Sequence, residues 1–350
     1  MSKQYGFGII GAGMIGNFHA EAVRQLGNAR LVAVCDTVPG AAAKVAGKHG
    51  CEASDDLEKF LSRKDIDVVT VATPSGTHAD LAIAAARHGK HCIAEKPIDI
   101  TLAKIDAAIA EHDKAGTKLG GIFNIRFLKT AQIFKQAVSE GRFGRLTFGL
   151  AYGPWWRDQA YYDGGGWRGT WKMDGGGALM NQGIHTIDLL QWLMGPVKRV
   201  HARCSTLAHE RIEVEDTAAA ILEFAGGALG ALACTTSMWP GHFRIVEVSG
   251  TDGTVAMADQ NFFFWQFRQE KPQDKEIREK YLEFPAVSMG ASNPSAGMTA
   301  DGHRDNFASF LKALDEGRRP EIDGAEARKA VQIILAVYES ARTGKPVELG

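Results

Sequence analysis

Two side chains in this sequence could act together on a hydroxyl group of a substrate. Lys96 stands between Glu95 and Pro97, directly after an apolar run at 91–94, and His185 lies in an apolar segment with helical periodicity. A lysine cation can bind an oxygen and stabilise the negative charge that develops on it. An imidazole, with an unperturbed pKa of about 6.5, can accept a proton near neutral pH. Taken alone, each also fits a plain structural interpretation, a surface lysine in a turn and a hydrogen-bonded core histidine.

Asn181, His185 and Asp188 are spaced to share one face of a helix, because residues three and four positions apart are neighbours on a helix surface. Asn181 could orient His185 or bind a substrate hydroxyl, but its amide cannot relay a proton as a carboxylate does. Asp188 could orient His185 or be an ordinary polar residue of the helix. The face as a whole also fits the polar side of a helix near its N-terminus.

A glycine-rich turn near the N-terminus has the spacing of a dinucleotide site. Gly11, Gly13 and Gly16 follow an apolar run at 7–10 and open a segment with helical periodicity, and a second apolar run ends at Asp36. Strand, glycine turn, helix and strand make the first βαβ unit of a dinucleotide-binding fold. We expect the glycines, with Met14 and Ile15 at the helix N-terminus, to bind the pyrophosphate. The alternative is a glycine-rich turn that binds no cofactor.

Asp36 bears on the choice of cofactor. It stands 20 positions after Gly16, where an acidic residue can bind the ribose hydroxyls, and no arginine follows it directly. A carboxylate there repels a 2′-phosphate, so the sequence predicts NAD rather than NADP. Thr73, Pro74 and His78 follow the strand-like run 68–72 and are expected to flank the cofactor, although His78 could equally be a polar residue at a helix N-terminus.

The alternation of elements predicts an α/β protein of two domains. Across residues 1–123, strand-like runs alternate with helical segments, as in a Rossmann-type, doubly wound parallel sheet. Residues 124–350 contain several strand-like runs at short spacing, which predict a mostly antiparallel sheet. Helices are predicted over 127–141 and 178–194, followed by a polar irregular stretch at 269–298 and two closing helices around 301–316 and 324–342. A length of 350 residues fits two such domains.

Composition excludes several classes of function. The net charge of −1 and the lack of a basic run argue against nucleic acid as a partner, and no apolar run approaches the roughly 20 residues of a membrane helix. The five cysteines have no metal-ligand spacing such as CxxC, so no metal site is predicted. They indicate reduced core residues of a cytoplasmic protein. The first strand begins near Tyr5, which leaves no room for a signal peptide.

Residues 153–177 are rich in Gly, Trp, Tyr and Arg. Aromatic faces pack on the apolar faces of sugar rings, and arginine binds carboxylate or phosphate in a bidentate manner. The stretch therefore predicts substrate contacts, with a small aromatic core as the alternative. The residues concerned are Trp155, Trp156, Arg157, Tyr161, Tyr162, Trp167, Arg168 and Trp171.

The segments GIIGAGMIG, VATPSGTHADLA, AEKPI, GGGALMNQGIHTIDLLQWLMG and EDTAAAILEF occur in this order. With them, the sequence resembles the Gfo/Idh/MocA family of nicotinamide-dependent oxidoreductases over nearly its whole length. The resemblance implies a Rossmann domain, followed by an α+β domain whose open, mostly antiparallel sheet mediates assembly into a homodimer or homotetramer. The stretch from Tyr161 to His185 looks most like the branch that contains UDP-N-acetylglucosaminuronate 3-dehydrogenases and glycoside 3-dehydrogenases.

The resemblance also implies roles for individual residues. It makes Lys96 the group that binds the reacting oxygen, with Glu95 and Lys96 beside the cofactor, and His185 the general base. Asn181 stands where many members have Asp, which puts a proton relay at that position in doubt. The predicted substrate contacts are Lys96, Arg157, Trp167, Arg168, Asn181 and His185. With Lys96 from the first domain and His185 from the second, the active site is expected where the domains meet.

Three functions compete at this point. The first is hydride transfer between NAD and a secondary ring hydroxyl of a sugar, glycoside, sugar nucleotide or cyclic polyol. The second is an NAD-using glycosidase or lyase that oxidises a ring carbon transiently and regenerates NAD in each turnover. The third is an NAD-binding regulatory module, against which the pair of Lys96 and His185 argues, since a sensor needs neither.

Overall fold

The computed structural model describes residues 3–284 and 299–350 and divides into two compact units. The first is Met1–Asn124 together with Thr299–Lys329, and the second is Ile125–Met298 together with Ala330–Gly350. The second predicted domain, 124–350, is therefore interrupted, because its segment Thr299–Lys329 packs with the N-terminal unit. The five cysteines are free thiols.

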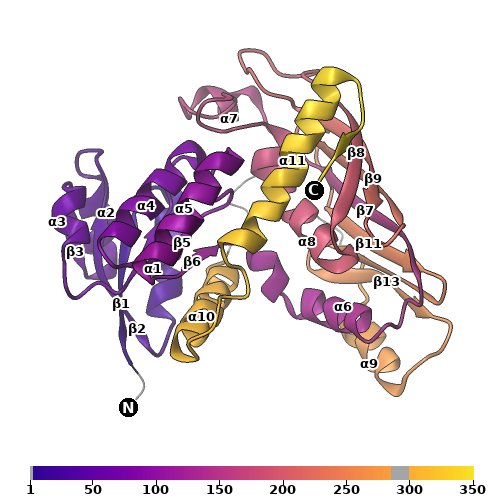
Figure 1. Ribbon diagram of the computed structural model, residues 1–350, viewed down its shortest axis with the longest axis horizontal. Coiled ribbons are helices and arrows are strands. Elements are labelled where there is room, and N and C mark those ends of the chain that lie inside the picture. Colours follow the sequence, from indigo (N-terminus) through magenta and orange to yellow (C-terminus); the bar gives the residue numbers. More distant parts are fainter. Residues whose placement is uncertain (1–2, 285–298) are drawn as a thin grey trace. The chain divides into compact units, whose positions relative to one another are not determined.

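The first unit is built on a six-stranded sheet in the order β3-β2-β1-β4-β5-β6, and every neighbouring pair is parallel (Figure 1). This is the predicted Rossmann sheet. The strands are β1 (Tyr5–Ile10), β2 (Ala29–Cys35), β3 (Glu52–Ser54), β4 (Val68–Val71), β5 (His91–Ala94) and β6 (Leu119–Gly121). The helices are α1 (Met14–Arg24), α2 (Ala41–His49), α3 (Leu57–Leu61), the 3₁₀ turn η1 (Ser75–Thr77), α4 (His78–Arg87), α5 (Leu102–Ala115) and α10 (Asp301–Asp315).

Helix α10 explains why the C-terminal segment returns to this unit. Its apolar residues Phe307, Phe310 and Leu311 are buried in one cluster with Phe7 of β1 and Val23 of α1. The central strands β1 and β4 are buried at every residue, which requires cover on both faces of the sheet. Without α10, part of that cover would be missing.

The second unit is built on an eight-stranded sheet in the order β13-β12-β11-β7-β10-β9-β8-β14. Only β7 and β10 pair in parallel among these neighbours, so the sheet is mostly antiparallel, as predicted. The strands are β7 (Leu146–Pro154), β8 (Val197–Ser205), β9 (Thr217–Phe224), β10 (Leu229–Thr235), β11 (Ile245–Gly250), β12 (Gly253–Ala258), β13 (Asn261–Phe267) and β14 (Val347–Glu348). The helices are α6 (Lys129–Ser139), α7 (Gln159–Asp163), the π-helical turn η3 (Ala178–Gly183), α8 (Ile184–Met194), α9 (Pro272–Tyr281) and α11 (Gly324–Thr343), with the 3₁₀ turn η2 (Asn124–Phe127) at the passage between the units.

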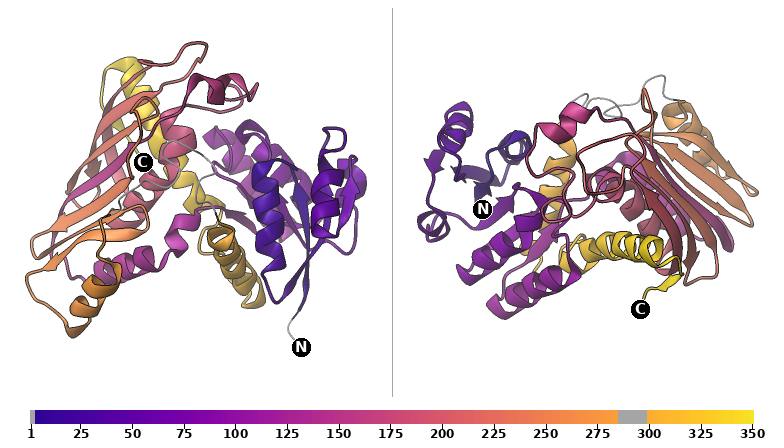
Figure 2. Two further views of the ribbon diagram at one scale, coloured as in Figure 1. Left: turned by 180° about the vertical axis from the view of Figure 1, so that it is seen from behind. Right: turned by 90° about the horizontal axis from the view of Figure 1, so that it is seen from above.

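Helices cover one face of this sheet, namely α6, α8 and the part of α11 after Lys329 (Figure 2). In the described part of the chain, the other face carries no helix. The alternation in β9 and β10 matches this arrangement, because Leu222 and Leu232 are buried while Ile221 and Leu229 are 60% and 53% exposed. One face of the sheet thus presents apolar side chains to its surroundings.

Two local predictions need correction, and one strand was not predicted. The segment 178–194 is not one regular helix, since it begins with the π-helical turn η3. The stretch 269–298 is not irregular throughout, because Pro272–Tyr281 form α9 with proline at its first turn, and residues 285–298 lie outside the described part. Strand β13 was not predicted.

Within residues 3–284 and 299–350, no helix combines the length and apolarity that crossing a bilayer needs.

Candidate functional site

The glycine turn has the backbone that a dinucleotide site requires. Gly11 has a φ of +102°, and its N–H donates to the carbonyl of Cys35 at 2.9 Å. A Cβ on Gly16 would lie 2.0 Å from the carbonyl oxygen of Gly11, so only glycine lets α1 start this close to the strand. A Cβ on Gly13 would meet nothing within 4 Å, which leaves open room beside the N-terminus of α1. The turn therefore fits a bound pyrophosphate, next to Met14 and Ile15.

Asp36 lies beside this turn, directly after β2. One carboxylate oxygen accepts the N–H of Ala12 at 2.7 Å, and the other accepts the N–H of Val38 at 2.8 Å. These bonds fix the carboxylate against the glycine turn, and each oxygen retains capacity to accept a ribose hydroxyl. The arrangement fits the predicted adenosine ribose site.

The position of Asp36 leads to a prediction about cofactor selectivity. We expect NAD(H) to bind at least about tenfold more tightly than NADP(H), because a 2′-phosphate would meet the carboxylate with like charge; tenfold is about 1.4 kcal/mol. Asp36→Asn keeps an acceptor for the N–H of Ala12 but removes the negative charge. The substitution should therefore reduce the difference in affinity between NAD(H) and NADP(H). Titration of both cofactors into both proteins, followed by protein fluorescence, measures this. Equal affinities in the wild type would contradict it.

His78 is engaged with two loops. Its Nε2 lies 2.7 Å from the carbonyl oxygen of Thr73, and its Nδ1 lies 2.7 Å from that of Pro97. The ring is buried and links the Thr73-Pro74 loop after β4 to the turn after β5. His78 is also the first residue of α4, in agreement with the alternative that it is a polar residue at a helix N-terminus. Its position beside the cofactor stays a prediction.

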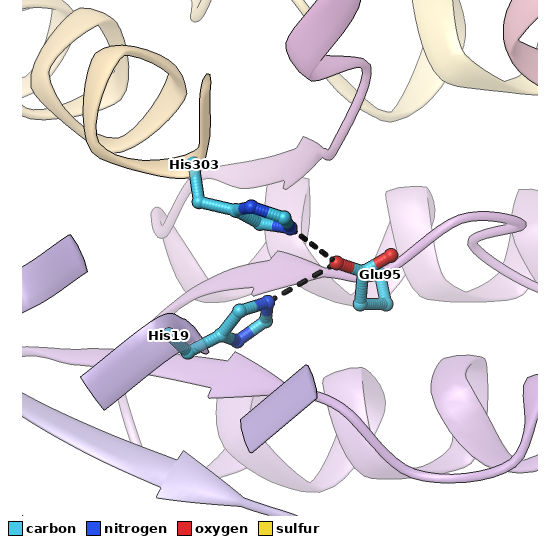
Figure 3. A group of neighbouring side chains, drawn as sticks. All are labelled: His19, Glu95 and His303. Atoms are coloured by element: carbon cyan, nitrogen blue, oxygen red, sulfur yellow. Dashed lines mark hydrogen bonds and ion pairs between the residues drawn. The ribbon is translucent and has the colours of Figure 1, made fainter. Parts of the chain in front are cut away.

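Lys96 belongs to the turn that follows β5, and its peptide bond to Pro97 is cis. Its backbone N–H donates to Oε2 of Glu95 at 3.0 Å. The Glu95 carboxylate, predicted to lie beside the cofactor, is buried within the unit, where Oε1 lies 3.1 Å from Nε2 of His19 and 3.0 Å from Nε2 of His303 (Figure 3). Sequence reasoning missed both histidines. The only signal for His19 was a polar residue beside the apolar stripe of α1.

The two imidazoles decide the charge of Glu95. Burial opposes ionisation of this carboxyl, but hydrogen bonds from His19 and His303 outweigh that effect and hold the pKa of Glu95 well below its usual value. Burial also lowers the pKa of His19. Glu95 is therefore an anion near neutral pH, and His19 is a neutral donor.

In the second unit, Asn181 and His185 stand on either side of the change from η3 to α8. The Nδ2 of Asn181 donates to Asp174 Oδ1 at 2.8 Å, and Asp174 Oδ2 accepts the N–H of Gly169 at 3.0 Å. Asn181 lies in the π-helical turn η3 and His185 in α8, so the two residues do not belong to one regular helix. A buried carboxylate, Asp174, stands next to the amide that replaces the usual Asp.

Asp188 pairs with a buried arginine of the same unit. Its two carboxylate oxygens accept Nε and Nη2 of Arg126 at 2.7 and 2.6 Å, and both side chains are buried. This bidentate pair ties α8 to the start of the second unit. Asp188 thus has a structural partner in Arg126, and its role in orienting His185 stays a prediction.

Glu215, which precedes β9, holds the turn that carries Asn181. Its carboxylate accepts the N–H groups of Gly177 and Leu179 at 3.0 and 2.9 Å and the hydroxyl of Tyr338 at 2.9 Å. Burial raises the pKa of Glu215 to about 7, although these donors favour its charged form. Glu215 opens the segment EDTAAAILEF, but no sequence signal linked it to Gly177, Leu179 or Tyr338, which are far from it along the chain.

The predicted aromatic and arginine residues gather around Tyr161. The guanidinium of Arg157 lies 5.5 Å from the Tyr161 ring centroid, and that of Arg168 lies 4.8 Å from it and 4.9 Å from the ring of Trp167. Gln182, next to Asn181, donates to the Tyr161 hydroxyl at 3.1 Å. The structure thus brings Arg157, Trp167 and Arg168 together at η3. Trp171 lies apart from this cluster, edge-on to Tyr338.

The predicted site residues fall into two groups. Gly11, Gly13, Met14, Ile15, Gly16, Asp36, Thr73, Pro74, His78, Glu95 and Lys96 belong to the first unit. Arg157, Trp167, Arg168, Asn181 and His185 belong to the second. Within the first unit, the nitrogen and oxygen atoms of His19, Glu95 and His303 are also close enough to be candidate metal ligands, which sequence reasoning did not foresee.

Comparison with known proteins identifies both units. Residues 5–122 match a family model described as an oxidoreductase family with an NAD-binding Rossmann fold, and residues 131–256 match the GFO/IDH/MocA C-terminal domain. The chain is 32% identical to inositol 2-dehydrogenase of Rhizobium meliloti (strain 1021) and 28% identical to myo-inositol 2-dehydrogenase of Thermotoga maritima, with 98% of each chain covered in both cases.

A solved structure of a related protein has the same fold as this chain. The WlbA dehydrogenase from Bordetella pertussis, solved with NADH and UDP-GlcNAcA, superposes with a TM-score of 0.88 at 33% identity over 99% of both chains. The predictions of the Rossmann fold, the second sheet and NAD are thereby confirmed. This chain belongs to the Gfo/Idh/MocA family and is an NAD-dependent oxidoreductase.

Proposed function

We propose that this enzyme oxidises or reduces a secondary ring hydroxyl of a carbohydrate or cyclic polyol that carries an anionic group. The arginine pair around Tyr161 is the observation that supports the anionic group. Arg168 Nε is buried and has no hydrogen-bond partner among the described residues, so a ligand carboxylate or phosphate could satisfy it. The relatives that act on inositol, and the WlbA structure solved with UDP-GlcNAcA, support a ring polyol as the reacting part.

The chemistry divides among a few side chains. When bound along the glycine turn and Asp36, NAD supplies the acceptor for the hydride that leaves the substrate carbon. Lys96 binds the reacting oxygen and stabilises its developing negative charge. His185 takes the hydroxyl proton as general base. Asn181, whose amide nitrogen is held by Asp174, offers its carbonyl oxygen to a neighbouring substrate hydroxyl.

The function is tested by following NADH absorbance with a panel of inositols, neutral sugars, uronates and sugar nucleotides. Acidic members should be oxidised with higher kcat/KM than neutral rings of the same configuration. Preference for neutral rings would overturn the proposal of an anionic group. Oxidation of no panel member, with NAD bound, would overturn the dehydrogenase proposal for ring hydroxyls.

Substitution of the arginines gives a sharper prediction. Arg168→Ala should raise KM for the acidic substrate by about tenfold to a hundredfold, because a charge-assisted hydrogen bond contributes about 1.5–3 kcal/mol. Arg157→Ala should act in the same direction, with some added loss of stability, since Arg157 is itself buried. Lys172→Ala, a charge removal at a neighbouring exposed position, is the control. If neither arginine variant changes KM or kcat/KM while NAD affinity stays constant, the cluster is structural only.

The NAD-using glycosidase or lyase remains the alternative, because the same residues would serve it. The two classes differ in their net products. A dehydrogenase accumulates one NADH for each substrate oxidised, whereas the alternative converts substrate without net NADH. Quantifying NADH and converted substrate in the same reaction separates them.

Two further observations support our proposals for the assembly and location of the protein. The bare face of the second sheet exposes Phe148, Ile221 and Leu229, which fits an interface between copies in a homodimer or homotetramer. Sedimentation analysis would detect the homodimer or homotetramer, and a monomer at micromolar concentration would rule out this assembly. Five free thiols fit a reducing compartment, so we place the protein in the cytoplasm, which fractionation of its source cells would check.

A further inference from the structure

Glu95 joins three distant parts of the chain inside the first unit. His19 comes from α1, Glu95 follows β5 and His303 comes from α10 (Figure 3). Their side chains are 0%, 9% and 4% exposed. A carboxylate withdrawn from water so completely is costly unless its charge is matched by hydrogen bonds. Glu95 directly precedes Lys96, the residue that we propose binds the reacting oxygen of the substrate.

Three of the hydrogen bonds in this cluster are directed at the Glu95 carboxylate. Oε1 accepts Nε2–H of both His19 and His303, and Oε2 accepts the backbone N–H of Lys96. The other nitrogen of His19 lies 3.1 Å from Oγ1 of Thr70, a buried residue of β4. With Nε2 donating to Glu95, His19 Nδ1 accepts from the Thr70 hydroxyl. Three N–H donors thus fix the orientation of both carboxylate oxygens.

We propose that His19 and His303 are positioning residues for Lys96. Both imidazoles hold the Glu95 carboxylate in place by hydrogen bonds. Glu95 in turn fixes the backbone N–H of Lys96, next to the Cα that carries the lysine side chain. This inference rests on the proposed role of Lys96. Its physical basis is that a catalytic group must be held within about 0.5 Å of its working position, and that a displacement of about 1 Å can lower a rate by about a hundredfold.

The decisive comparison is between two substitutions of His303. His303→Leu removes the donor, whereas His303→Gln places an amide N–H at similar reach. We expect His303→Leu to lower kcat by about tenfold to a hundredfold with little change in NAD affinity, and His303→Gln to recover most of the loss. His112→Leu is the matched control, since His112 is also buried in the first unit but binds Thr117 at 2.7 Å. It should reduce stability without a comparable loss of kcat.

A double-mutant cycle separates this inference from the proposed function. If His303 acts through Lys96, its substitution should have almost no further effect on hydride transfer in a Lys96→Met background. Full additivity of the two losses would overturn the positioning role while leaving Lys96 in place. A wild-type rate for Lys96→Met alone would overturn the proposed function instead.

Nitrogen NMR of the labelled wild-type protein provides a test that does not depend on folding of a variant. Both His19 and His303 should carry a slowly exchanging proton on Nε2. A His303 that is protonated only at Nδ1 would overturn the proposal. Stoichiometric binding of Zn²⁺ that is lost in the His303→Leu variant would also overturn the proposal. The imidazole nitrogens would then be metal ligands and not hydrogen-bond donors to Glu95.

Discussion

Replacing His185 by alanine should lower kcat by about 10²–10⁴-fold, the usual contribution of a general base. The variant should fold and bind NAD, because His185 belongs to the second unit and the glycine turn to the first. Single-turnover hydride transfer, measured across pH for wild type and variant, tests this. In the wild type the rate should rise as the imidazole loses its proton, and in the variant that rise should disappear.

His201→Ala is the control for this experiment, because it removes an exposed imidazole from β8 of the same unit. It should leave the rate and its pH profile unchanged. A His185→Ala enzyme that transfers hydride at the wild-type rate near neutral pH would exclude His185 as the base. Lys96 or Tyr161 would then be the next candidates for proton removal.

Replacing Lys96 by methionine should reduce hydride transfer to a comparable degree, by about 10²–10⁴-fold. Methionine retains much of the side-chain bulk but has no charge, so the alkoxide that develops on the substrate loses its stabilising partner. Because this interaction strengthens as charge develops, the loss should appear in kcat more than in KM. Stopped-flow measurement of NADH formation at saturating substrate checks it.

Lys114→Met, which removes an exposed cation from α5, is the matched control and should leave the rate unchanged. A Lys96→Met enzyme with normal kcat and a raised KM would show that Lys96 contributes only to binding the substrate. Unchanged kinetics would remove Lys96 from the mechanism altogether.

The sequence predicted those elements whose boundaries are set by local chemistry. β5 occupies the apolar run at 91–94 seen in the sequence, and Glu95-Lys96-Pro97 marks its end in the chain itself. The π-helical turn η3 escaped prediction because its backbone is held by the carboxylate of Glu215, which is distant in sequence and is itself bound by the Tyr338 hydroxyl. The placement of α10 depends likewise on packing against β1 and α1.

The candidate site shows the same limit. Gly11, Gly16, Asp36 and Lys96 could be recognised because their spacing from a strand end carries the signal. Their supporting residues, such as His303 and Asp174, have no such local pattern. A buried polar group acquires its role only from the partner that the fold brings to it, so its sequence neighbours carry little information.

The return of Thr299–Lys329 to the N-terminal unit has a consequence for protein synthesis. A ribosome must translate about six-sevenths of this chain before Phe307 and Phe310 can cover the apolar surface of β1 and α1. Until then the nascent Rossmann sheet exposes that surface, where it invites aggregation or binding by chaperones. His303 arrives with the same segment, so the environment of Glu95 can be completed only near the end of translation. A transcript that stops before residue 299 would therefore yield a cofactor domain without its last structural layer.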